Sequence, residues 1–81
     1  MILCIDIGNT NIVYATWNNN FSNIKRIETG KHNLSISDKN KITNIAISSV
    51  VPDLTDYYEN YFKELCNIEP FIVTHKNCRV K

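Results

Sequence analysis

The chain has 81 residues, of which 43% are hydrophobic, and this length allows one small domain. A two-domain enzyme with a closed active site is excluded, because so short a chain buries only about 60–65% of the surface that its unfolded form exposes. Nine basic and eight acidic residues are scattered along the chain and give a formal net charge of +1, which argues against a nucleic-acid-binding protein.

Cysteine usage and hydropathy indicate a protein of the reducing cytoplasm. Cys4, Cys66 and Cys78 lie far apart and form no Cys-x-x-Cys pair, so no zinc or redox site is predicted. The amino terminus does not resemble a signal peptide, because Asp6 follows only five residues. No apolar run approaches the roughly 20 residues that span a bilayer, so we expect no membrane contact.

The beginning of the chain predicts an antiparallel meander of three strands. Its apolar and β-branched runs are separated by two turn signals, Gly8-Asn9 and the three asparagines at 18–20, since asparagine tolerates left-handed backbone angles. The third strand is the weakest, because its apolar positions do not alternate. The expected strands are residues 2–5 with an extension to residue 7, residues 11–17, and residues 21–28.

The middle of the chain predicts a polar crossover followed by a buried strand. Residues 30–43 are polar, and Ser35 could begin a short helix with Ile36 and Ile42 on its apolar side. Residues 45–51 are apolar on both faces, which is typical of a central parallel strand covered on both sides.

The clearest helix begins at Pro52, since proline is favoured at the first helical position, and ends at Asn67. Its apolar stripe predicts that three tyrosines belong to the core or to an interface rather than to a ligand site. The stripe consists of Leu54, Tyr57, Tyr58, Tyr61, Phe62 and Leu65. A fifth strand is expected at residues 71–74, and a polar tail follows it.

Together these elements predict an α/β fold. Three antiparallel strands and two later parallel strands would form a mixed five-strand sheet with its first and fourth strands central. Ligands of open α/β sheets bind beyond the carboxyl ends of such strands, here residues 6–8 and Ser48-Ser49. We expect the two serines to pack or to lie beside a phosphate rather than to act as nucleophiles, since neither His32 nor His75 has the spacing of a base partner.

Residues 6–11 carry the most informative chemistry. The Asp6 carboxylate is expected inside a central strand and needs a partner or a metal, because burying an unpaired charge is costly. Gly8 allows close backbone approach and unusual backbone angles, and the turn amides that follow could form an anion-binding concavity. Asp6 could then hold Mg²⁺ through water while the metal bridges phosphates.

An ordinary hairpin turn is the alternative for the same residues, with Asp6 accepting hydrogen bonds from the turn amides. The segment is not a Walker A loop, because no Gly-Lys-Ser/Thr follows it.

Two segments resemble the type III pantothenate kinases, which belong to the actin/hexokinase/Hsp70 superfamily. Residues 1–13, Met-Ile-Leu-Cys-Ile-Asp-Ile-Gly-Asn-Thr-Asn-Ile-Val, are similar to the opening of that family. Residues 47–52, Ile-Ser-Ser-Val-Val-Pro, are similar to its Ser-Ser-Val-Val-Pro segment. Trp17 and residues 26–29 resemble the family's third strand loosely. The resemblance covers nearly the whole chain and roughly the first third of the family's length.

The resemblance implies a truncated, ribonuclease H-like half-domain of an actin-like ATPase, with residues 1–81 as the amino-terminal part of the first ATPase domain and the second domain absent. It implies transfer of the ATP γ-phosphate to the 4′-hydroxyl of pantothenate, the first step of coenzyme A biosynthesis. Mg²⁺, a K⁺ or NH₄⁺ ion and a homodimer are implied for full-length members. The implied ATP contacts are Asp6, Ile7, Gly8, Asn9, Thr10, Asn11, Ile12 and Val13, with Asp6 also holding Mg²⁺ through water.

The catalytic base implied by the family lies in a Gly-Ala-Asp-Arg motif, which we expect beyond Lys81. No catalytic residue is therefore expected within the chain, and the chain alone is expected to be inactive; Asp38, Asp53 and Asp56 do not match that motif. The family usually has a helix of roughly three turns there, and the crossover at residues 30–43 is abbreviated, which indicates a degraded or divergent gene.

Two alternatives to a catalytic part stay open. One is a non-catalytic remnant or a split subunit that binds a partner half. The other is a different kinase or a nucleotide-dependent regulator of the same superfamily, against which the Ser-Ser-Val-Val-Pro segment argues.

Overall fold

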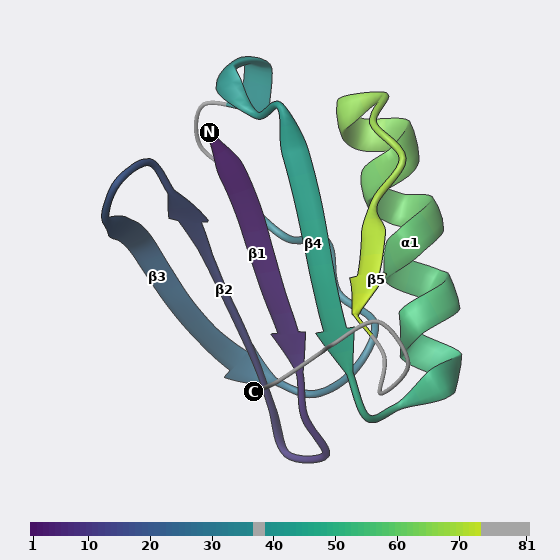
Figure 1. Cartoon of the computed structure of the whole chain (residues 1–81). Helices are drawn as coiled ribbons and strands as arrows, with labels where there is room; N and C mark the ends of the chain where they lie inside the picture. The colour runs from purple at the N-terminus through teal and green to yellow at the C-terminus, as the bar shows by residue number, and fades with distance from the viewer. Residues whose placement is uncertain (37–38, 74–81) are drawn as a thin grey trace, which may run out of the picture.

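The computed structural model describes residues 1–36 and 39–73, whose five strands form a single mixed sheet in the order β3-β2-β1-β4-β5 (Figure 1). Neighbouring strands are antiparallel from β3 to β1 and parallel from β1 to β5. The expected meander and the expected parallel strands are thus confirmed, with β1 in the centre. The strands are β1 (Ile2–Ile7), β2 (Asn11–Trp17), β3 (Phe21–Glu28), β4 (Asn44–Ser49) and β5 (Phe71–Val73).

The helix α1 spans Pro52–Cys66, as the sequence predicts. Pro52 takes the first helical position, where its missing N–H has no partner to lose. Asn67 follows in the left-handed conformation, with φ 57°, and ends the helix. None of the described helices is long and apolar enough to cross a membrane.

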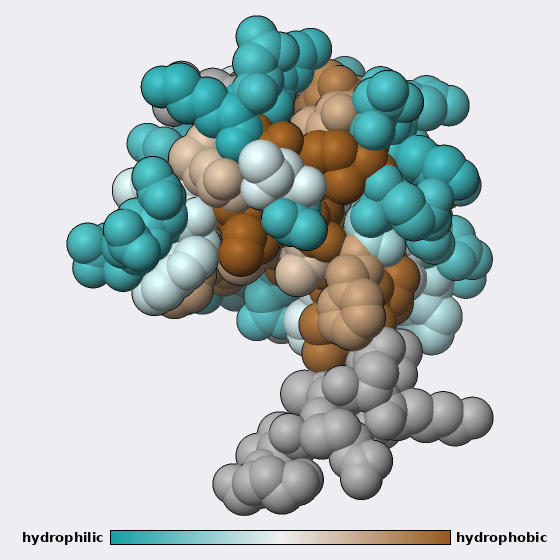
Figure 2. Space-filling view, turned by 45° about the horizontal axis from the view of Figure 1, so that its top comes forward, coloured by the Kyte–Doolittle hydropathy of each residue, from teal (hydrophilic) through white to brown (hydrophobic). Residues whose placement is uncertain are grey.

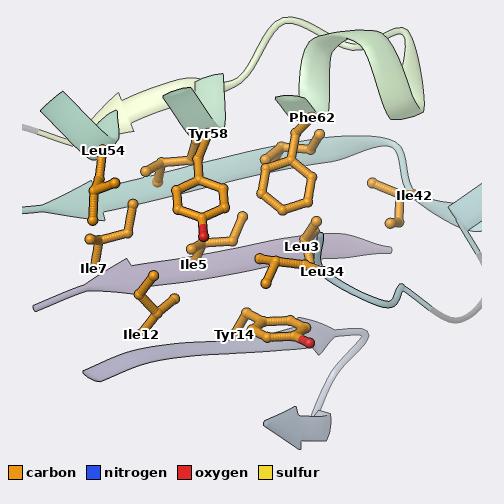
Figure 3. Packing of buried hydrophobic residues seen from close by; sticks show 12 residues of the cluster. Leu3, Ile5, Ile7, Ile12, Tyr14, Leu34, Ile42, Leu54, Tyr58 and Phe62 are labelled. Carbon is orange, nitrogen blue, oxygen red and sulfur yellow. The ribbon is translucent and has the colours of Figure 1, made fainter. Parts of the chain in front are cut away.

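One face of the sheet, called here the covered face, packs against α1 and carries the core. Figure 3 shows Leu54, Tyr58 and Phe62, one helical turn apart, pointing from α1 toward alternate side chains of β1 and β2. Each such side chain contributes about 1.5–3 kcal/mol on burial. The sheet supplies Leu3, Ile5, Ile7, Ile12, Tyr14, Ile45 and Ile47 to this core.

The crossover between β3 and β4 passes over the same face, and its described residues do not form the expected short helix. Within the described residues it contains only a 3₁₀ turn, Lys39–Lys41, and Ser35 begins no described helix. Leu34 and Ile42 are nevertheless buried in the core, and Ile36 packs against it. The extended crossover therefore covers part of this face of the sheet, as a helix would.

Hydroxyl groups of the α1 tyrosines hold this crossover in place. Tyr58 accepts a hydrogen bond from the His32 amide at 3.0 Å and donates one to the Gly30 carbonyl at 2.6 Å. Tyr61 donates to the Leu34 carbonyl at 3.2 Å. The expectation that the tyrosines belong to the core is confirmed. Their hydroxyls also satisfy backbone groups of the crossover that no sheet or helix pairs.

The opposite face of the sheet, called here the open face, is not covered by any described element, so the expectation that the fourth strand is covered on both sides is wrong for this part of the chain. Ala46 and Ser48 of β4 line a groove of about 340 Å³ there. Hydrophobic side chains reach the surface in the middle of the molecule, framed by hydrophilic ones (Figure 2). The groove is lined by Cys4, Ile5, Asp6, Val13, Ala15, Phe21, Ile24, Ala46, Ser48 and Val73.

A β-bulge explains why the apolar residues of the third strand do not alternate. Tyr14 pairs with Lys25 and Thr16 pairs with Ser22, so β3 has one residue more than β2 between these two pairs. Asn23 adopts φ 54° within this extra length. The bulge shifts the alternation by one residue and leaves Phe21 and Ile24, three positions apart, both lining the open face.

Two boundaries differ from the sequence prediction or lie beyond the described residues. β4 ends at Ser49 rather than at residue 51, because the chain turns there toward α1. β5 is described over Phe71–Val73, and Thr74, the last residue of the expected fifth strand, lies outside the described residues.

Candidate functional site

The tight turn between β1 and β2 is the centre of the candidate site. The Gly8 amide donates a hydrogen bond to the Asn11 carbonyl at 2.9 Å and closes the turn. A Cβ atom added to Gly8 would lie 3.1 Å from the same oxygen, which is closer than most side-chain contacts, so glycine suits the close backbone approach here. The other expected reason is wrong, because Gly8 does not have a positive φ.

Asp6 lies near the carboxyl end of β1 with its side chain on the open face. Its cross-strand neighbours are Val13 in β2 and Ser48 in β4, and its side chain is exposed. The expectation of a buried carboxylate is therefore wrong. The chemical need for a partner is correspondingly smaller, because water can solvate an exposed charge.

The Asp6 carboxylate has no hydrogen bond or ion pair with any other described residue. In particular, it does not accept hydrogen bonds from the turn amides, so a hairpin turn forms but without the Asp6 hydrogen bonds that the alternative expected. The carboxylate remains available to a cation or to water.

Asn9 and Thr10 form the exposed tip of this turn. Their backbone amides donate to no described acceptor. Two successive free amides at a tight turn can form a small positive concavity of the kind that binds phosphate oxygens. The tip can therefore offer N–H donors at the same edge of the sheet as the Asp6 carboxylate.

The remaining predicted contacts divide between the core and the open face. Ile7 and Ile12 pair across the two strands, and both side chains are fully buried. They fasten the base of the turn to the core, so only their backbone could face a ligand. Val13 lines the groove beside Asp6, and Asn11 is half-buried.

Thr29, which follows β3, is a site residue that the sequence reasoning did not single out. Its hydroxyl donates to the Gly8 carbonyl at 2.7 Å, and its amide donates to the Thr10 carbonyl at 3.0 Å. The available sequence signal was its position at the end of a strand that pairs with β2 next to the turn. Its hydroxyl could not be assigned to Gly8 without the three-dimensional register.

The two serines at the end of β4 have different surroundings. Ser48 lies on the open face next to Asp6. The Ser49 hydroxyl accepts from the Val51 amide at 3.0 Å and donates to the Val51 carbonyl at 3.1 Å, so it shapes the turn into α1. Val50 donates to the Ile7 carbonyl at 3.1 Å and ties this turn to the end of β1.

His32 does not support a nucleophilic serine. The His32 ring lies within hydrogen-bond distance of the Glu28 carbonyl, at 2.8 Å from Nε2, and has no hydrogen bond with either serine. His75 lies outside the described residues. The expectation that Ser48 and Ser49 are packing or phosphate-adjacent residues therefore holds for Ser49, which packs in a turn.

The side chains at this edge of the sheet could bind a magnesium ion only if phosphate oxygens and water supplied its other ligands. Within residues 1–36 and 39–73, no three histidine, cysteine, aspartate or glutamate side chains gather into a metal cage. Burial raises the pKa of the Cys4 thiol, which keeps that neighbour in the groove protonated. One free carboxylate matches the way Mg²⁺ is usually held, by one or two carboxylates with water and substrate phosphates.

Comparison with known families agrees with this geometry. A family model described as Type III pantothenate kinase matches residues 2–81 and includes both the turn after β1 and the turn after β4. The mixed five-strand sheet with its helix is consistent with the actin-like half-domain of that family. Because the match extends over nearly the whole sequence, the chain belongs to the type III pantothenate kinase family.

Proposed function

We propose that this chain provides the ATP-phosphate-binding turn of an enzyme that transfers the γ-phosphate of ATP to the 4′-hydroxyl of pantothenate. The family is one of kinases, which use ATP and a divalent metal in general. One observation carries the assignment to these residues: an unpaired Asp6 carboxylate and the free amides of Asn9 and Thr10 lie at one edge of the sheet. Residues 1–81 would then form the amino-terminal part of an actin-like ATPase domain.

Each residue of the turn has a distinct role in this proposal. The amides of Asn9 and Thr10 donate to phosphate oxygens, and Gly8 keeps the turn narrow enough for both to face the same ligand. Asp6 would hold Mg²⁺ through water, and the bound ion would supply neutralisation of phosphate charge. Ile7 and Ile12 fix the turn to the core, so that the donors are oriented before ATP arrives.

The family's Gly-Ala-Asp-Arg motif does not occur in the 81 residues. The catalytic base, the pantothenate pocket and the monovalent-cation site that the family resemblance implies are not assigned to residues 1–81 in this proposal. The corresponding non-catalytic alternative is a remnant or a split subunit that binds a partner half. Pantothenate-dependent release of ADP from the chain alone, followed in a coupled assay, would contradict both.

Replacement of Asp6 by asparagine tests the proposal directly. Asp6→Asn keeps the shape of the side chain and removes its charge, so calorimetric titration should show weaker binding of Mg·ATP, with little change for ATP in the absence of Mg²⁺. In any preparation that phosphorylates pantothenate, turnover should fall at least about 100-fold, because metal positioning supplies much of phosphoryl-transfer catalysis. The thermal midpoint should change little, since the carboxylate has no described partner to lose.

The matched control is Glu64→Gln, which removes an exposed carboxylate from α1 and should leave Mg·ATP binding unchanged. A destabilised Asp6→Asn protein that still binds Mg·ATP as tightly as the unchanged chain would exclude the metal-site role.

A further inference from the structure

The carbonyl groups of the phosphate-binding turn are fixed from outside the turn. Thr29 lies 21 positions after Gly8 and is half-buried, and its hydroxyl reaches the Gly8 carbonyl at 2.7 Å. Its amide reaches the Thr10 carbonyl at 3.0 Å. One residue therefore holds two carbonyls of a four-residue turn.

Because of peptide geometry, the hydrogen bond from Thr29 to the Gly8 carbonyl also sets the direction of the Asn9 amide. In a trans peptide the C=O and the following N–H point in opposite directions. Because the Gly8 carbonyl points to Thr29, the Asn9 amide in the same peptide unit points away from Thr29. That amide donates to no described acceptor, and it is one of the two donors assigned above to phosphate.

Thr29 is itself anchored to the core through the next residue. The Gly30 carbonyl accepts a hydrogen bond from the Tyr58 hydroxyl at 2.6 Å, and Tyr58 is fully buried. The described contacts thus run from the buried face of α1 through Gly30 and Thr29 to the turn.

We propose that Thr29 is a positioning residue, which holds the turn in the shape that presents the Asn9 amide to the phosphates of ATP. This inference rests on the proposed function for its ligand. Its structural part, the control of the turn by the Thr29 hydroxyl, does not depend on ATP.

The test uses the 81-residue chain and three variants. Thr29→Val keeps the shape and the amide of the residue but removes the hydroxyl, and Thr29→Ser restores a hydroxyl at the same place. Thr16→Val is the matched control, since the Thr16 hydroxyl lies 3.3 Å from the Ser22 carbonyl and bonds β2 to β3 near the other end of the sheet. Each protein is examined by Mg·ATP titration, by the amide NMR signals of residues 8–11 and by thermal unfolding.

Thr29→Val is expected to bind Mg·ATP about tenfold more weakly, the effect of losing one hydrogen bond. The amide signals of Gly8 and Asn9 should shift or broaden in the same variant. Thr29→Ser should restore both properties, whereas Thr16→Val should lower the thermal midpoint without altering either of them. Rescue by serine separates positioning from a general loss of stability.

Three results would overturn the inference: unchanged affinity and unchanged turn signals in Thr29→Val, failure of Thr29→Ser to restore them, or equal losses in Thr16→Val. If the unchanged chain does not bind Mg·ATP, the proposed function fails for this chain. The turn signals of the three variants then decide by themselves whether Thr29 controls the turn.

Discussion

The two hairpin turns of the meander, at opposite ends of the sheet in Figure 1, form in different ways. The turn at residues 8–11 is based on a fully buried isoleucine pair, Ile7 and Ile12, and is held by two hydrogen bonds from Thr29. The turn at residues 18–20 is closed by a bond from the Asn18 amide to the Asn20 carbonyl at 3.1 Å.

The residues that flank the second turn, at residues 18–20, are close in sequence and exposed to solvent. Trp17 and Phe21 flank it as an edge-to-face pair with centroids 4.8 Å apart, and they are 39% and 57% exposed. Asn19 supplies the left-handed backbone with φ 71°. Residues next to each other in sequence thus make the second turn, whereas the first is held by distant residues. The difference suggests that the proposed ligand-binding turn is the one whose shape the whole fold controls.

Loss of the Tyr58 hydroxyl should have the largest effect on stability among the substitutions that affect one turn and not the other. Tyr58→Phe removes both hydrogen bonds that hold Gly30 and His32, and it leaves an amide and a carbonyl without their partner. We expect the free energy of unfolding to fall by about 1–3 kcal/mol in urea denaturation. The amide signals of residues 8–11 should change as well, while those of residues 18–20 should not.

Tyr57→Phe is the matched control for this change. The Tyr57 hydroxyl lies 3.5 Å from the His32 carbonyl in an exposed bond, so its loss should cost less than about 0.5 kcal/mol. Equal losses in the two variants would show that the crossover is not held mainly by Tyr58.

Gly8→Ala should have the next largest effect, and it tests the first turn from within. The added Cβ would meet the Asn11 carbonyl at 3.1 Å, so the turn has to widen. We expect a loss of about 1 kcal/mol of stability, at the lower end of the cost of inserting a methyl group into a packed site. Affinity for Mg·ATP should also decrease. A variant with unchanged stability and affinity would show that the turn tolerates a wider form.

Asn19→Gly should have the smallest effect, because glycine adopts the left-handed conformation of Asn19 readily. The free energy of unfolding should change by no more than about 0.5 kcal/mol, as for most exposed positions. Signals of residues 8–11 should stay in place. A loss larger than that of Gly8→Ala would contradict the view that the second turn depends mainly on local conformation.

Much of the fold could be predicted because its signals are local. The apolar runs of β1, β2 and β4, the helical stripe of α1, Pro52 at its start and Asn67 at its end all act within a few residues. The turn at residues 18–20 is another local signal, since asparagine itself tolerates the left-handed backbone conformation that the turn needs. For these elements the amino-acid sequence by itself determined the structure.

Part of the candidate site could be predicted for the same reason. The sequence placed Asp6 and Gly8 at the end of β1 and identified the close approach at Gly8. It did not show that Asp6 is exposed, because four apolar residues before a carboxylate look alike whether one face or both faces of the strand are covered.

Only the tertiary structure decided how the turn after β1 is held and which face of the sheet is covered. The Thr29 hydroxyl meets Gly8 across 21 positions, and the Tyr58 hydroxyl meets Gly30 across 28. Such contacts depend on strand register, on the bulge at Asn23 and on the side of the sheet to which α1 returns. The type of a residue does not predict these contacts, because they form only when segments far apart in the sequence pack against the same core.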